Sequence, residues 1–281
     1  MIDAVSASAS PLPQATITTS WDDGHLADLR LADLLETYRI PATFYIPQFD
    51  RLADKPVLEP AQLHDLADRG FEIGAHTINH TVLPTVADKV ARQEIIDSRH
   101  YIADATGRKC VMFCAPQGKF TAAHLGMIRD AGFAGLRTVE MWSTDPPRPR
   151  PRPRKKSNSD GGGLVEMPTT LQAHPQSNAS IARNLLKRRA VSNAWLYLKH
   201  GRAAANDWPA QAAALLDHVL AHGGVFHLWG HSWELEAYDQ WARLEAVLAK
   251  LQAAADRATL STNAQVCAAY ASANPSITTT T

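Results

Sequence analysis

Short β-prone runs alternate with stretches of helical hydrophobic pattern along this chain, and this alternation is the strongest constraint on its fold. Strands are predicted at residues 16–21, 42–46, 71–75, 111–115, 133–139, 164–169 and 225–229. Helices are predicted between and after them, at 26–38, 60–69, 87–105, 121–131, 181–198, 210–222 and 238–258. Repeated βα units form mostly parallel sheets. Because polar residues follow several different strands, we predict an α/β fold with one (β/α) barrel of about seven strands rather than an open sheet.

The length of 281 residues suits a single barrel domain. We expect a flexible N-terminus over residues 1–15, the main folded domain over 16–260 and a C-terminal tail over 261–281. Residues 146–163 (PPRPRPRPRKKSNSDGGG) contain no apolar side chain and alternate proline with arginine. Proline fixes φ and removes a backbone donor, so this segment is predicted to be an exposed loop inserted into the domain. A basic patch for an anionic partner is the weaker alternative.

Composition excludes several classes of protein. Twenty-eight basic residues balance twenty-eight acidic ones, so no overall field favours nucleic acid or an anionic membrane. No apolar run approaches the roughly 20 residues of a transmembrane helix, and the first residues lack the pattern of a signal peptide. The three cysteines fit a reducing compartment. We therefore expect a cytoplasmic protein with no transmembrane segment and no nucleic-acid partner; the oligomeric state stays open.

Two carboxylates come directly after the first predicted strand. Asp22 and Asp23 precede Gly24, and at a strand end that turns on glycine one carboxylate can bind a metal while the other faces a water. Asp-Gly is also a common turn dipeptide. Taken alone, this segment favours the turn.

Three histidine pairs have a four-residue spacing, which allows two imidazoles to share one divalent ion. The pairs are His76 with His80, His218 with His222, and His227 with His231. With twelve histidines in the chain, the spacing alone is weak evidence. The second pair lies late in an alanine-rich helix, where histidine near a C-terminus is ordinary. Only the first pair follows a strand in the way the two aspartates do.

The last predicted strand brings a third cluster. His227 lies within the strand, where a core histidine bonded to the backbone is the better interpretation, and His231 lies just past its end. Histidine titrates near neutrality and suits a general acid for an amine leaving group. The placement of polar residues at three separate strand ends indicates a site there.

These segments resemble the polysaccharide deacetylase family, carbohydrate esterases with a deformed (β/α) barrel, over residues of about 16–233. The segment SWDDG, at 20–24, is similar to the first motif of the family. The resemblance implies that Asp22 is the catalytic base and that Asp23 is a metal ligand.

Two further motifs extend the resemblance. HTINH, at 76–80, matches the His-Ser/Thr-x-x-His metal motif and implies that His76 and His80 are the other ligands, with Thr77 bracing the loop. The segment 228–231 resembles the late Leu-x-x-His motif, which implies that His231 is the general acid.

The third motif departs from the family pattern. Where the family carries Arg-Pro-Pro-Tyr-Gly, this chain has CAPQG at 114–118, so the arginine is missing. The resemblance implies that the Gln117 N–H donates to the oxyanion, and Arg137, near the end of the next β-prone run, is the candidate for the lost charge. The residues that tune the acid are not identified by motif; the candidates are Glu140, Trp142 and Glu166.

The sequence thus predicts a hydrolase that uses one divalent ion, with Zn²⁺ expected and Co²⁺ or Ni²⁺ as alternatives, to remove an N-acyl group from an amino sugar or saccharide conjugate. Acetyl is the expected acyl group. Four tryptophans are candidates to supply apolar faces for a sugar ring: Trp21, Trp142, Trp229 and Trp233. One alternative is a hydrolase of a small non-sugar amide or imide on the same scaffold. The other is a metal-bound binding module that has lost catalysis, for which the missing arginine is the argument.

Overall fold

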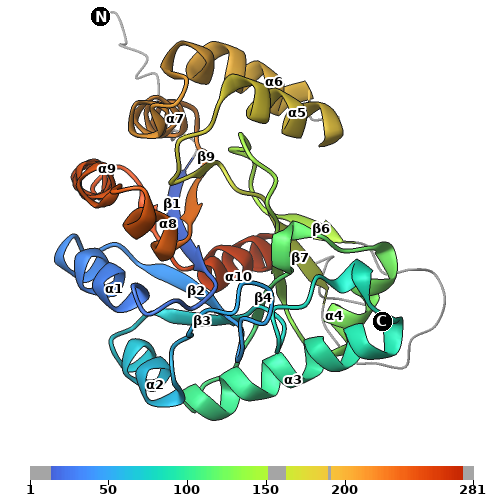
Figure 1. Cartoon of the computed structure of the whole chain (residues 1–281). Coiled ribbons are helices and arrows are strands. Elements are labelled where there is room, and N and C mark those ends of the chain that lie inside the picture. Colours follow the sequence, from blue (N-terminus) through green and yellow to red (C-terminus); the bar gives the residue numbers. More distant parts are fainter. Residues whose placement is uncertain (1–13, 151–162, 189–190, 275–281) are drawn as a thin grey trace, which may run out of the picture.

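A computed structural model describes residues 14–150, 163–188 and 191–274 of the chain. Its sheet curls into a half-barrel with most of the helices packed outside it (Figure 1). The strands are β1 (Ala15–Asp22), β2 (Ala42–Ile46), β3 (Glu72–Ala75), β4 (Met112–Cys114), β5 (Gly135–Arg137), β6 (Arg148–Arg150), β7 (Leu164–Met167), β8 (Leu171–Gln172), β9 (Gly224–Gly230) and β10 (Thr259–Leu260). The sheet order is β6-β7-β5-β4-β3-β2-β1-β9-β8, and β10 pairs with the start of β1. Within this described sheet only the β6–β7 pairing is antiparallel.

The helices follow the strands as the alternation predicts. They are α1 (Asp28–Thr37), α2 (Pro60–Asp68), α3 (Asp88–Thr106), α4 (Ala122–Asp130), α5 (Asn178–Arg188), α6 (Val191–Leu196), α7 (Trp208–His222), α8 (Ser232–Ala237), α9 (Trp241–Ala253) and α10 (Asn263–Ala273). The side chain of Thr121 caps α4 by accepting a hydrogen bond from the His124 N–H. Among the helices of the described residues, none combines the length and the apolarity that crossing a bilayer requires.

Irregular backbone bridges β7 and β9 across the open side of this half-barrel. The Thr169 N–H donates to the Glu140 carbonyl and the Trp142 N–H to that of Thr170, each over 2.8 Å. The Thr170 N–H donates to the His227 carbonyl over 2.9 Å, which links this segment to β9. The predicted fold class, a deformed (β/α) barrel, is therefore confirmed, and the deformation is concentrated at this gap.

Three local predictions differ from the structure. The helix predicted at 181–198 is α5 and α6, on either side of residues 189–190, which lie outside the described residues. The helix predicted at 238–258 is shorter, because Asp239 has a φ of 49° that a helix does not accommodate and α9 begins at Trp241. In the predicted loop 146–163, Arg148–Arg150 forms strand β6 against β7, and residues 151–162 lie outside the described residues.

Helix α10 occupies part of the segment that was expected to be a C-terminal tail. Val266 and Cys267 of this helix pack on a buried cluster inside the barrel that includes Tyr45 and Met112. Asn263, at its start, accepts a hydrogen bond from the Tyr45 hydroxyl over 2.8 Å. The alanine-rich sequence of α10 has almost no apolar stripe, which is why the hydrophobic pattern did not indicate it.

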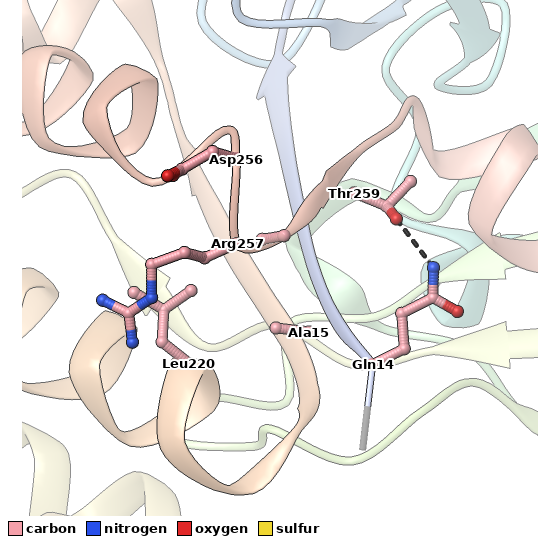
Figure 2. A pocket seen from close by; sticks show the side chains of 7 residues that line it. Gln14, Ala15, Leu220, Asp256, Arg257 and Thr259 are labelled. Carbon is pink, nitrogen blue, oxygen red and sulfur yellow. Dashed lines mark hydrogen bonds between the residues drawn. The ribbon is translucent and has the colours of Figure 1, made fainter. Parts of the chain in front are cut away.

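The end of the barrel where β1 begins is tied to the C-terminal part of the chain. The Gln14 side-chain amide donates to the Thr259 hydroxyl over 2.8 Å (Figure 2). Thr16 and Ile17 of β1 then pair in parallel with Thr259 and Leu260 of β10. The polar residues predicted to form a site lie at the other end of β1, beyond its carboxyl end.

His227 is a fully buried residue of β9 with a partner for each ring nitrogen. Its Nδ1 donates to the Pro168 carbonyl over 2.9 Å, and its Nε2 accepts from the Ser20 hydroxyl over 2.9 Å. Burial and the charge of Arg137 lower the pKa of His227 to about 3. The structure therefore agrees with its interpretation as a core histidine.

We predict that His227 makes the fold acid-sensitive. Between pH 6.5, its ordinary pKa, and about 3 the unfolded chain binds a proton that the folded chain does not, so stability falls as pH falls. The slope from this group approaches about 1.4 kcal/mol per pH unit. In His227→Gln, urea unfolding from pH 7 to 4 should show a shallower decline than wild type. His100→Gln, on the exposed face of α3, is the matched control.

Candidate metal centre and catalytic site

One pocket at the carboxyl ends of the strands brings the candidate residues together. It has a volume of about 440 Å³, and its lining includes Asp22, Asp23, His76, His80, Gln117 and His231. These residues come from four separate segments, after β1, β3, β4 and β9. The remaining candidate, Arg137, lies directly behind Asp22. The juxtaposition expected from their positions at strand ends is therefore present.

Asp23, His76 and His80 offer three ligand atoms to one point. These atoms lie within 4.8 Å of one another, and all three residues are buried. The His76 and His80 Nε2 atoms lie 3.5 and 3.1 Å from Asp23 Oδ1. Burial opposes ionisation of Asp23, yet hydrogen bonds from both imidazoles hold the pKa of its carboxyl well below the usual range. A carboxylate with two imidazoles fits a divalent ion that keeps open positions.

The two imidazoles are oriented by their other nitrogens. His76 Nδ1 donates to the Cys114 carbonyl over 2.8 Å, and His80 Nδ1 donates to Asp50 Oδ1 over 2.6 Å. Such partners orient the two rings so that each Nε2 faces Asp23, where both could bind a metal. Asp50 was missed by sequence reasoning because it lies in the loop after β2, far from any motif.

A second group of possible ligands, Asp22 with His76 and Cys114, is a poorer metal site. Burial raises the pKa of the Cys114 thiol well above its ordinary value, so it is not a thiolate. Asp22 is already paired with Arg137. The structure therefore favours Asp23 over Asp22 as the carboxylate ligand.

The backbone of the site is strained. Asp23, Thr77, His80 and Gln117 have φ values of 80°, 59°, 56° and 56°. This left-handed region costs non-glycine residues free energy and is common at functional sites, where the surrounding structure holds it in place. The Thr77 hydroxyl braces its turn by accepting a hydrogen bond from the Thr81 N–H over 2.8 Å.

Asp22 and Arg137 form an ion pair inside the barrel. Arg137 Nη2 donates to Asp22 Oδ1, and the guanidinium is fully buried. Its central carbon lies 5.1 Å from the Tyr45 ring centroid and 4.9 Å from that of Trp229. Burial disfavours the charge, but the neighbouring carboxylate keeps the pKa of Arg137 above its ordinary value. Asp22 therefore faces a permanent cation.

The register of the sheet explains how Arg137 reaches this position. Cys114 stands where the family motif carries arginine, and it is the direct partner of Arg137 in the parallel pairing of β4 with β5. Two residues paired across neighbouring strands project toward the same face of the sheet. The charge of Arg137 thus lies one strand away from Cys114, at the same level of the barrel.

His231 is held by a carboxylate that sequence reasoning missed. Its Nδ1 donates to Glu234 Oε2 over 2.7 Å, while its Nε2 lies 3.9 Å from Asp23 Oδ2. Burial opposes protonation, but the hydrogen bond with Glu234 and the nearby charges of Asp23 and Asp22 raise the pKa of His231 to about 9. The imidazole is therefore protonated at neutral pH, as a general acid must be.

The residues proposed from sequence to tune the acid lie elsewhere. Glu140 pairs with Arg148, Glu166 pairs with Arg150, and Trp142 is buried against Tyr197 with ring centroids 5.0 Å apart. Glu234 lies one turn after His231 on α8, a spacing that could have indicated it.

Two of the four candidate tryptophans line the pocket. Trp229 and Trp233 lie in its wall, whereas Trp21 and Trp142 are fully buried in the core. Trp233 also donates from Nε1 to Asp23 Oδ2 over 3.0 Å, which orients that carboxylate.

Comparison with known proteins agrees with the resemblance. Residues 9–136 match the family model described as polysaccharide deacetylase. A peptidoglycan-N-acetylglucosamine deacetylase from Bacillus cereus is 27% identical over 138 residues, which is 48% of this chain and 61% of that protein. The chain thus spans about three fifths of this relative. The predicted resemblance to polysaccharide deacetylases is confirmed, and it is strongest in the N-terminal half, before Arg137 and His231.

Solved structures share the whole fold. A Mycobacterium smegmatis protein assigned to the polysaccharide deacetylases superposes with a TM-score of 0.62 and 17% identity, over 97% of this chain and 96% of that one. An allantoinase superposes with a TM-score of 0.68 and 11% identity, over 98% and 99%. At these identities the likeness concerns the fold, which hosts more than one activity.

We predict that removing either imidazole abolishes metal binding. After dialysis against Zn²⁺, His76→Ala and His80→Ala should retain none, Asp50→Asn should bind about 10–100-fold more weakly, and Asp22→Asn should retain the metal. Metal content measured by mass spectrometry decides this, with the exposed His64→Ala as control. Full occupancy in a His76→Ala/His80→Ala double variant would contradict the assignment.

The Asp22–Arg137 pair leads to a second prediction. Arg137→Met leaves a buried carboxylate unpaired, so unfolding free energy should fall by about 3–5 kcal/mol and kcat by at least about 100-fold. Cys114→Arg combined with Arg137→Met returns the cation to the neighbouring strand and should recover part of both. If the double variant is no better than the single one in urea unfolding and kcat, the two positions are not equivalent.

Glu234 should control the pH range of activity. Glu234→Gln removes the charge that raises the pKa of His231, so the acid loses its proton at lower pH. The alkaline limb of the kcat profile is then expected to move toward neutrality. Glu236→Gln, on the same helix, is the matched control, and an unchanged limb in Glu234→Gln would argue that His231 is not the acid.

Proposed function

We propose that this chain is a metal-dependent hydrolase that removes an N-acyl group, acetyl in the first instance, from an amino sugar or saccharide conjugate. The main support is that one pocket brings together three groups of side chains with complementary chemistry. These are a cluster of one carboxylate and two imidazoles, a carboxylate paired with a buried arginine, and a protonated histidine. Amide hydrolysis needs all three functions: an activated water, a base and an acid.

Asp23, His76 and His80 would hold the ion. Their donor set suits Zn²⁺, with Co²⁺ and Ni²⁺ as alternatives. A divalent ion bound there supplies a water of lowered pKa and polarises the acyl carbonyl.

The chain's own residues carry the proton transfers. Asp22 takes a proton from the water as its oxygen attacks the acyl carbon, and Arg137 positions Asp22 for this step. The Gln117 N–H donates to the oxygen that becomes negative. His231 gives its proton to the nitrogen as the carbon–nitrogen bond breaks, so a carboxylic acid and a free amine leave.

The residues that line the pocket favour a saccharide as the substrate. Trp229 and Trp233 contribute aromatic side chains to the pocket lining, and Gln176 and Ser180 contribute hydrogen-bonding groups. An apolar face beside polar rims matches a pyranose ring, which has apolar C–H faces and hydroxyl edges.

Hydrolysis of a small non-sugar amide remains the alternative function, because a protein with another activity shares this fold. The likeness to an allantoinase covers nearly the full length of both chains, so the scaffold does not distinguish a sugar from a small amide. The cytoplasmic location expected from sequence would favour a soluble or carrier-linked amino sugar over a mature polymer, and that location stays a prediction.

Substrate screening tests the proposal. With purified chain loaded with Zn²⁺, release of acetate from N-acetylglucosamine, its oligomers and nucleotide-linked N-acetyl sugars is compared with hydrolysis of allantoin and other small amides. We expect release of acetate from a saccharide. Chelation of the metal should abolish this release, and added Zn²⁺ should restore it. Asp22→Asn serves as the inactive control. Turnover of small amides alone would favour the alternative enzyme, and no metal-dependent turnover of either would favour the binding module.

A further inference from the structure

Helices α5 and α6 expose an unusual amount of apolar side chain. Apolar residues of these helices and of the π-helical turn after α6 (Tyr197–Gly201) line one groove of about 420 Å³, formed by Ala182, Leu185, Leu186, Val191, Ala194, Tyr197 and Leu198. We call these residues, together with Trp195 beside them, the α5–α6 surface. Figure 1 shows the two helices side by side at the top of the view, on the periphery of the molecule.

Several apolar side chains of this surface are mostly exposed to solvent. Val191 is 82% exposed, Leu186 79% and Leu198 60%, and these are the three most exposed large apolar side chains of the described chain. Trp195 is 55% exposed. Contiguous exposed apolar groups of this kind mark a surface that binds a protein or a membrane.

Charge distinguishes between these two kinds of partner. The segment 174–206 contains no aspartate or glutamate but several arginines and lysines. Arg183, Lys199 and Arg202 are exposed there, and Lys199 Nζ lies 4.8 Å from the Trp195 ring centroid. The overall charge of zero conceals this local excess.

A second copy of the chain fits this surface poorly. A twofold dimer would place the same basic residues opposite each other, without an acidic residue in the segment to compensate. Nucleic acid is bound mainly through basic and stacking aromatic groups, whereas the exposed groups here are mostly aliphatic.

An anionic bilayer satisfies all of these features. Leucine and valine side chains enter the boundary below the headgroups, tryptophan favours the interface, and basic residues meet lipid phosphates. We propose that the α5–α6 surface docks this protein onto an anionic lipid bilayer.

The position of α5 links this surface to the pocket. Ser180 and Asn184 of α5 line the pocket of the candidate site, while Leu186 on the same helix belongs to the docking surface. Docking would therefore hold the pocket close to the membrane plane, where the polar part of an amphiphilic molecule lies. The docking itself does not rest on the proposed hydrolysis.

Vesicle cosedimentation of the full chain tests the proposal. We expect binding to vesicles of phosphatidylcholine mixed with phosphatidylglycerol, weakened by salt, and little binding to phosphatidylcholine alone. Leu186→Gln/Leu198→Gln should weaken binding more than about ten-fold, because two leucines that docking would bury are lost. Lys199→Gln should weaken it about five-fold, since each basic residue near an anionic surface contributes on the order of 1 kcal/mol.

Matched substitutions on α3 provide the controls. Val90→Gln replaces an exposed apolar residue and Lys89→Gln an exposed basic residue, both on α3 and far in sequence from the α5–α6 surface. These variants should leave vesicle binding unchanged. Circular dichroism checks that all variants are folded. Absence of binding to anionic vesicles, or equal binding by the Leu186→Gln/Leu198→Gln variant, would overturn the proposal. A dimer in sedimentation velocity that the same variant disperses would assign the surface to a second copy instead. Because no substrate is used, none of these results bears on hydrolysis.

Discussion

The contact between Arg137 and Asp22 is the constraint on which the architecture of the site depends. Two charges are buried inside the barrel, and such burial is costly unless each has its partner and a favourable surrounding. Here the guanidinium lies between the rings of Tyr45 and Trp229. The pair therefore requires strands β1, β2, β5 and β9 to hold their register together. A shift of one residue in any of them would turn a charged or aromatic side chain to the wrong face.

A cation lies beside the position where the family motif carries its arginine. The family arginine and Arg137 differ in sequence position by the whole of α4, yet Cys114 and Arg137 are paired residues of adjacent strands. Asp22, the proposed base, has its cation at this level of the barrel, and here β5 supplies that cation. The same reasoning applies to Glu234, which restrains His231 from the following helix.

Average composition and local composition lead to different views of the surface. The equal numbers of acidic and basic residues predicted no field toward anionic membranes. That reasoning holds for the molecule as a whole at distances beyond the Debye length, about 8–10 Å at ordinary salt. At contact distance, however, the charge of a single helical hairpin matters, and α5 and α6 combine a local basic excess with exposed leucine, valine and tryptophan.

The sequence by itself determined the βα alternation, most strand positions and the residues that follow the strands, because hydrophobic period and turn residues are local properties of the chain. It indicated Asp22, Asp23, His76, His80 and His231 through motifs that each lie within a few residues. Only the tertiary structure decided which groups support them. Asp50, Glu234 and Arg137 reach their partners through loop geometry, a helical turn and strand register. Likewise α10 is stabilised by the barrel interior that it fills rather than by a strong pattern of its own. These contacts join segments far apart in the chain, so no local pattern contains them.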